Sequence, residues 1–282
     1  MILRRVIEHV REQNWTAIGI DFVIVVVGVF VGIQVANWNA ALADERLGRA
    51  YAARLTADLE RDLASRRALV AYYGAVLGNV ERTDALLADP QADPKELVVA
   101  AYRASEINYS PPSGATWDEI VSSGDTGLLP RDAASRVAEY FAFDTARSSF
   151  EGLQQSAYRH RVRTVIALAV QKALRAGCSD VRNEAQQITG FMPGCTLNIE
   201  HETIVATAAA LRAEPAVQAS LRYQYSEVYS AHANISGDVV AIEQALAALS
   251  GQLLAGETSP CSCAASSPTS ASRNGPRSGS IC

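Results

Sequence analysis

The stretch Trp15–Trp38 reads W-T-A-I-G-I-D-F-V-I-V-V-V-G-V-F-V-G-I-Q-V-A-N-W and decides how the rest of the chain is interpreted. Between positions 18 and 36, only Asp21 and Gln34 are clearly polar. About 20 helical residues cross a hydrocarbon core of about 30 Å, and tryptophans favour its two interfaces. The apolar run at 22–33 also leaves no polar face for a soluble surface helix. The sequence therefore predicts a transmembrane helix over residues 15–38.

A cleaved signal peptide is the alternative interpretation of this segment, because Ala41-Leu42-Ala43 matches an A-x-A cleavage site. The apolar run is longer than a usual signal-peptide core and contains Asp21, which favours an uncleaved signal-anchor. Three arginines precede the span and three follow it, so the charge count alone is tied. The first positive cluster of a signal-anchor usually stays in the cytoplasm. We therefore expect a single-pass protein of the bacterial inner membrane, with a cytoplasmic amino terminus and a periplasmic C-terminal domain.

Four residues inside the span are candidates for contact with another membrane helix: Asp21, Gly28, Gly32 and Gln34. Gly28 and Gly32 form G-x-x-x-G, a pattern that lets two helix backbones approach closely and is typical of a homodimer or a membrane-protein partner. A charged acid this deep costs a few kcal/mol if it stays unpaired, at roughly 3 kcal/mol on insertion scales. Asp21 can be protonated, reach the interface, or pair with Arg11 or a partner helix. The bilayer itself is the first expected partner.

The segment Val25–Asn39 resembles the signature of a family of bacterial single-pass inner-membrane proteins that carry a domain of unknown function. The family pattern G-x-x-x-G-x-Q-x-x-N-W-N is matched here by Gly28, Gly32, Gln34 and the N-W-N at 37–39. A second, weaker likeness lies in T-W-D-E-I-V-S-S-G-D-T-G-L-L at 116–129. The resemblance implies a membrane-anchored helical protein and implies no activity.

The whole-chain composition narrows the function classes. The chain has 282 residues and a formal net charge of −5, and it has no basic stripe interleaved with aromatic residues. These features argue against a nucleic-acid-binding protein. The five cysteines are too few for a disulfide-dense scaffold. A high alanine content favours helix over sheet, so we predict an all-α fold.

The rest of the chain divides into segments of different pattern. Residues 1–14 place apolar side chains on one helix face and charged side chains on the rest, which predicts an amphipathic helix on the membrane surface. Residues 39–88 carry one apolar face opposite the charge runs D-L-E-R-D and S-R-R, which predicts a solvated helical stalk that ends at Asp89-Pro90. A helical bundle is expected over 89–255. Residues 256–282 are rich in Ser, Pro and Gly, contain Cys261, Cys263 and Cys282, and predict a disordered tail.

Within the bundle, capping residues and prolines predict the helix boundaries. Asp93-Pro94 begins one helix, and T-W-D-E at 116–119 is the pattern of a capping box for another. One long helix is expected from Pro130 to about residue 175. Cys178 and Cys195 bracket an irregular loop at 177–194, and in an oxidising compartment they are expected to form a disulfide. The alternative is a pair of unpaired buried thiols.

Three short motifs suggest chemistry but have simpler explanations. Asp125-Thr126-Gly127 is the D-T-G of aspartic proteases, yet that chemistry needs two such carboxylates, and a turn ending a helix explains one copy. Glu200-His201-Glu202 lacks the spacing of a metal site. The basic run at 158–163 can bind an anion, or can pair with acids of a neighbouring helix. We therefore predict no catalytic residue, no metal ligand and no cofactor.

The sequence leaves three function classes open. The first is a membrane-anchored, non-enzymatic interaction or scaffold protein. The second is a ligand-sensing periplasmic bundle without its own output domain, which needs an apolar pocket lined by residues such as Trp117, Tyr140, Phe141 and Tyr225. The third is an enzyme, which has no nucleophile–base pair, metal cluster or phosphate loop to support it.

Overall fold

The computed structural model describes residues 15–257, with side chains described at positions 19, 20 and 22–250. Helix dominates this part of the chain, and the predicted all-α fold class is confirmed. The expected surface helix at 1–14 and the tail from 258 onward, with its three cysteines, lie outside the described residues. In chain order the elements are α2 (Trp15–Ala88), α3 (Pro94–Arg103), α4 (Ala115–Ser123), the 3₁₀ turn η1 (Asp125–Leu128), α5 (Arg131–Ala142), α6 (Thr145–Gln154), α7 (Ala157–Val165), α8 (Leu168–Gly177), β1 (Asp180–Arg182), β2 (Ile188–Phe191), α9 (His201–Ala213) and α10 (Pro215–Glu257).

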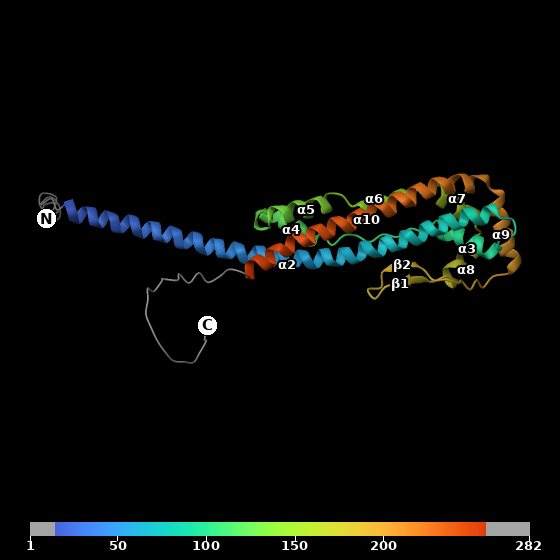
Figure 1. Cartoon of the computed structure of the whole chain (residues 1–282), viewed down its shortest axis with the longest axis horizontal. Helices are drawn as coiled ribbons and strands as arrows, with labels where there is room; N and C mark the ends of the chain where they lie inside the picture. The colour runs from blue at the N-terminus through green and yellow to red at the C-terminus, as the bar shows by residue number, and fades with distance from the viewer. Residues whose placement is uncertain (1–14, 258–282) are drawn as a thin grey trace, which may run out of the picture.

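Helix α2 is the longest of the described helices. Its 74 residues span about 110 Å at 1.5 Å per residue. Its first part projects alone from the bundle (Figure 1). Over the described residues, α2 is the one helix with a segment long and apolar enough to cross a membrane, with a mean hydropathy of 1.9 and none of that segment buried. A signal sequence would pass the same test. The helix stops at Ala88, immediately before Asp89-Pro90, as the sequence predicts.

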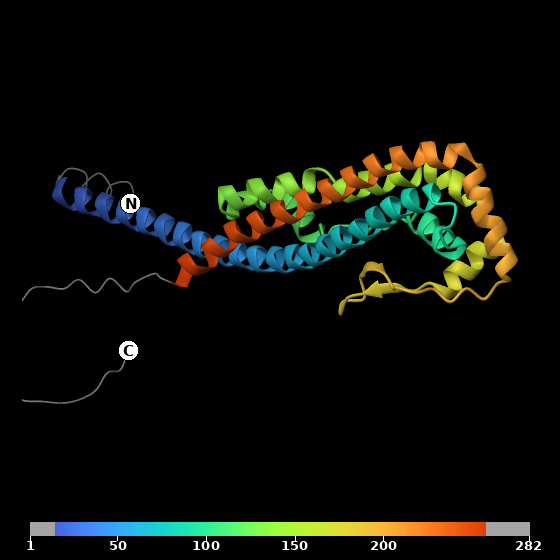
Figure 2. The same cartoon turned by 45° about the vertical axis from the view of Figure 1, so that its right-hand side comes forward.

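The expected division between a stalk at 39–88 and a separate bundle at 89–255 is not observed. Beyond its projecting part, α2 lies alongside α10 in the bundle (Figures 1 and 2). Its residues supply apolar side chains to both hydrophobic cores. The core nearer the projecting end gathers Tyr51, Leu55 and Leu59 with residues of α4, α5 and α10. The larger, far core joins α2 and α10 to α3, α7, α8 and α9. The apolar face that predicts a stalk is therefore a core face.

The single long helix expected from Pro130 to about residue 175 is wrong. The chain instead forms four short helices, α5 to α8, which pack mainly along α10 and the far end of the bundle. Asp144 accepts a hydrogen bond from the Arg147 backbone N–H, and Ser156 accepts one from that of Arg159. Each side chain thus caps a new helix. No Gly or Pro lies at these breaks. The apolar periodicity of the sequence therefore predicts one continuous helix across them.

Two further local details differ from the sequence prediction. The irregular loop at 177–194 contains an antiparallel hairpin of β1 and β2, and β2 packs on α2. The helix expected to begin with a Thr116 capping box begins earlier, at Ala115, with Gly114 as its N-cap and no side-chain cap. Thr116 is buried. The Asp93 cap of α3 forms as predicted, accepting from the Lys95 N–H.

Candidate functional site

The residues expected to contact another membrane helix lie on the projecting part of α2. Gly28 and Gly32 have open space beside them, with no atom within 4 Å of an added Cβ. The 100° rotation per helical residue places Asp21, Gly28 and Gly32 on one face and Gln34 on another. Gln34 is exposed, whereas the Asp21 side chain lies outside the described residues. Nothing else in the described chain packs against this face, so its contact role stays a prediction.

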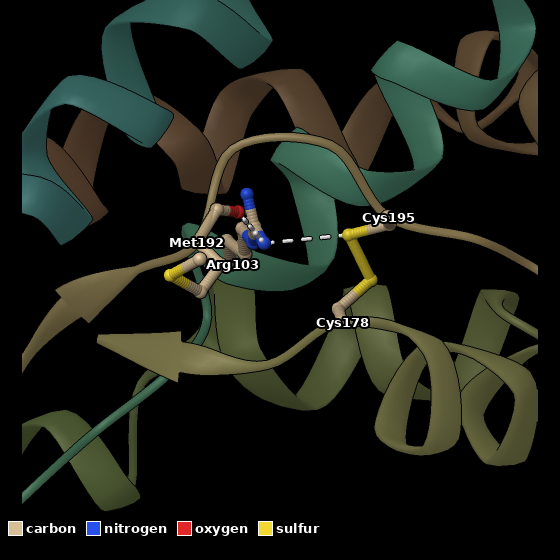
Figure 3. Close-up of a disulfide and its surroundings, with 4 residues drawn as sticks. All are labelled: Arg103, Cys178, Met192 and Cys195. Carbon is tan, nitrogen blue, oxygen red and sulfur yellow. Dashed lines mark hydrogen bonds between the residues drawn. A yellow bond between two sulfur atoms is a disulfide. The ribbon is translucent and has the colours of Figure 1, made fainter. Parts of the chain in front are cut away.

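Cys178 and Cys195 lie together at the end of the hairpin, joined as a disulfide with their Cα atoms 4.6 Å apart (Figure 3). Cys178 follows α8 directly, and the chain segment after β2 passes so closely that a Cβ on Gly177 would be 1.9 Å from the Thr196 carbonyl oxygen. Glycine is therefore required at this crossing. The neighbouring backbone bond, from the Thr196 N–H to the Gly177 carbonyl, measures 3.1 Å.

Arg103, the last residue of α3, ties this loop to the bundle (Figure 3). Its Nη2 donates to the Met192 carbonyl at 2.8 Å and to Cys195 Sγ at 3.3 Å. Its guanidinium also lies 5.1 Å from the centre of the Phe191 ring. Burial lowers the pKa of Arg103, and the nearby carboxylate of Asp180 opposes that effect. The disulfide and Arg103 together hold the hairpin against α2 and α3.

Three of the four aromatic residues expected to line a pocket come together. Trp117 of α4 and Phe141 of α5 stack with centroids 6.4 Å apart, and Tyr140 meets Phe141 edge-on at 4.8 Å. Trp117 and Phe141 line an open cleft of about 690 Å³ between α2, α4 and α5. Tyr225 is not part of it. That residue stacks on Tyr229 in α10 and borders a separate groove of about 460 Å³.

A buried ionic cluster lies beside this cleft, where the sequence predicts solvated charges. Arg66 of α2 is 1% exposed. Its guanidinium lies 3.5 Å from the Asp144 carboxylate and 3.4 Å from that of Asp238, and it donates to the Ser110 carbonyl at 2.8 Å. The charge runs at 58–62 and 65–67 are thus only partly solvated. The pattern hides this burial because the partners come from α6, α10 and a loop far along the chain.

Asp62 forms the second half of the cluster. It is 2% exposed, and its two carboxylate oxygens accept from the Ser113 N–H at 2.8 and 3.0 Å. The Tyr140 hydroxyl donates to it at 3.0 Å. Burial is the main cause that raises the pKa of Tyr140. Burial also raises the pKa of Asp238, with Asp144 adding to the rise and Thr145 and Arg66 opposing it.

The basic run at 158–163 makes contacts inside the protein. Arg163 lies 3.2 Å from the Glu106 carboxylate, and Arg175 of α8 binds the same carboxylate at 3.2 Å. Both guanidiniums lie over the Tyr102 ring, at 4.3 and 5.5 Å from its centre. Arg159 donates to the Ser105 carbonyl. This geometry favours pairing with neighbouring elements over a free anion site.

The other two motifs are turn and helix-end features. Asp125 lies in η1 after Gly124, which has the left-handed φ of 80° that ends α4, and it accepts from the Tyr51 hydroxyl at 3.0 Å. His201 is exposed at the start of α9. Over the described part of the chain, no three His, Cys, Asp or Glu side chains are arranged to hold a metal ion.

Comparison with protein-family models, curated proteins and solved structures finds no match to this chain. The resemblance carried by Val25–Asn39 therefore stays a prediction.

Proposed function

We propose that this protein is a membrane-anchored, non-enzymatic interaction module of the bacterial inner membrane. The projecting part of α2 carries the proposal. Its large apolar side chains, from Ile20 to Trp38, are between 48% and 70% exposed. An apolar surface this long on a soluble protein would drive aggregation, whereas a bilayer buries it on all sides. A lipid bilayer is therefore the partner that this surface fits.

The orientation rests on separate arguments. The leading arginines favour a cytoplasmic amino terminus, and the bundle would then fold in the periplasm. The close approach of Cys178 and Cys195 supports the same orientation, since disulfides persist in the periplasm and are rare in the cytosol. In this arrangement the bundle extends from the membrane and presents its long side to other proteins.

We expect a C-terminal reporter that is active only in the periplasm to give signal when fused after Cys282. The reason is that a signal-anchor keeps its basic end inside and translocates the following domain. A cytoplasm-only reporter at the same position is the control and should stay silent. The reverse result would contradict the orientation. Loss of residues 1–43 from the mature chain would instead indicate a cleaved signal peptide.

Gly28→Ile together with Gly32→Ile is expected to abolish most energy transfer between donor- and acceptor-labelled copies in liposomes. A large side chain on this face holds two helix backbones apart. Gly19→Ile is the matched control, because Gly19 lies nine residues before Gly28, on the opposite face of the same helix, and also has open space beside it. Unchanged transfer in the double variant would exclude a homodimer through this face.

The alternative is a ligand-sensing bundle without its own output domain. The cleft of about 690 Å³ with Trp117 and Phe141 favours it, since ligand sites combine a hollow, aromatic walls and a few polar groups. The two candidates are compatible, because an anchored module can bind a ligand and report it to a membrane partner.

A further inference from the structure

The cleft between α2, α4 and α5 has a stacked pair of aromatic side chains in its lining. Trp117 and Phe141 line it with their ring planes 13° apart. Indole and phenyl faces are negative at their centres and attract cations. A hollow of about 690 Å³ also lies within the range of small-molecule sites, roughly 300–1,000 Å³. The cleft thus offers both space and a surface for a ligand.

The charges around the cleft are unbalanced. Two carboxylates, of Asp58 and Asp118, and one guanidinium, of Arg61, line it. Arg61 pairs with Asp58, which leaves Asp118 without an ion pair among the described residues. Behind the wall, the buried Asp62 accepts hydrogen bonds only from neutral groups in the described structure. The cleft therefore has an excess of negative charge beside its stacked aromatic side chains.

The cleft is also held in shape before any ligand arrives. Both carboxylate oxygens of Asp62 hold the Ser113 N–H, which positions the loop at 112–114. At Gly114, a Cβ would lie 3.7 Å from Phe141 Cε1 and 3.8 Å from Asp118 Oδ2. The Phe141 ring and an unpaired carboxylate thus lie close to the same point of the cleft lining. Preorganisation of this kind lowers the entropic cost of binding.

We infer that this cleft binds a small organic cation of the quaternary-ammonium class, with Trp117 and Phe141 contacting the alkyl groups and Asp118 balancing the charge. A weakly hydrated organic cation suits aromatic faces, whereas Mg²⁺ and Ca²⁺ prefer a cage of oxygen ligands. The inference deepens the ligand-sensing alternative and does not depend on the interaction role of the membrane helix.

The test uses the full chain in lipid nanodiscs and two probes of the same shape, choline and its neutral isostere 3,3-dimethylbutan-1-ol. The chain has three tryptophans, so Trp15→Phe with Trp38→Phe leaves Trp117 as the sole indole reporter. Choline is expected to change Trp117 fluorescence saturably, and equilibrium dialysis should give an affinity about tenfold or more above that of the isostere. Equal affinity for the two probes, or no saturable choline binding up to about 10 mM, would overturn the inference.

Variants locate the site. Asp118→Asn and Phe141→Leu should each weaken choline binding about five- to tenfold in dialysis. Asp132→Asn is the matched control, because it removes the same charge from an exposed helix start outside the cleft and should leave affinity within about twofold. Circular dichroism confirms that each variant is folded. Equal losses in Asp118→Asn and Asp132→Asn would overturn the site, while the reporter and energy-transfer results would still decide the interaction role separately.

Discussion

Replacing Arg66 with methionine is expected to lower the free energy of unfolding by about 3–5 kcal/mol at neutral pH. Arg66 is 1% exposed, and its guanidinium is shared by Asp144 and Asp238, whose side chains are only 20% and 13% exposed. Removing one partner from a buried ion pair leaves uncompensated charge in a medium that solvates it poorly. Urea denaturation of the full chain in detergent, followed by circular dichroism, measures the change.

Two controls separate lost charge compensation from lost packing. In the triple variant Arg66→Met, Asp144→Asn, Asp238→Asn, most of the stability should return, because neither of the two groups that paired with the guanidinium is still charged and asparagine still caps α6. Arg67→Met is the matched control, since Arg67 is exposed and pairs with Glu243 at the surface, where a salt bridge contributes about 1 kcal/mol or less. A triple variant as unstable as Arg66→Met would show that the guanidinium acts mainly through its hydrogen bond to Ser110 and its packing.

The pH dependence of the Arg66→Met deficit provides a further check. Burial raises the folded-state pKa of Asp238, and Arg66 opposes that rise. A carboxyl group with a raised folded pKa contributes stability below its unfolded pKa of about 4 and loses it as the pH rises through the folded value. Without Arg66 the rise is larger, so the deficit should be small near pH 4 and grow toward pH 7. A deficit that does not change over this range would contradict an electrostatic origin.

The sequence predicts those features that depend on local pattern. The apolar run of α2, its end before Pro90 and the Asp93 cap are all present. Each is set by the residues of the segment itself, through backbone geometry or lipid-compatible composition. Three aromatic residues expected in one pocket, Trp117, Tyr140 and Phe141, also meet. They come from α4 and α5, and both helices contribute to the hydrophobic core nearer the projecting end of α2.

The sequence fails where burial depends on partners far along the chain. Asp62 and Tyr140 are 78 positions apart, so no local pattern indicates that the charged side of α2 faces inward. A run of alternating charges has the same sequence pattern whether it is exposed to solvent or covered by α6 and α10. The breaks at Asp144 and Ser156 are missed for a related reason. A capping side chain competes with the helix only when tertiary packing favours the turn.

Removing the Cys178–Cys195 link is expected to cost about 3 kcal/mol of stability, because it closes a loop with a sequence separation of 17. The effect should be local. The hairpin touches the rest of the chain through β2 on α2, where Phe191 meets Tyr72, and through Arg103, and we expect these contacts alone not to offset the regained chain entropy. Hydrogen exchange should therefore accelerate over 178–197, while α2 and α10 stay protected.

The design must isolate this pair from the three tail cysteines, which lie outside the described residues. A background with Cys261, Cys263 and Cys282 changed to serine leaves Cys178 and Cys195 as the only thiols. In that background, reductant and the Cys178→Ser, Cys195→Ser double variant should produce the same loss, and reductant should not affect the double variant. Non-reducing mass spectrometry should recover the two peptides linked. Free thiols at Cys178 and Cys195 in protein purified from membranes without reductant would contradict the disulfide. The two cysteines would then be unpaired, and they would no longer support the proposed orientation.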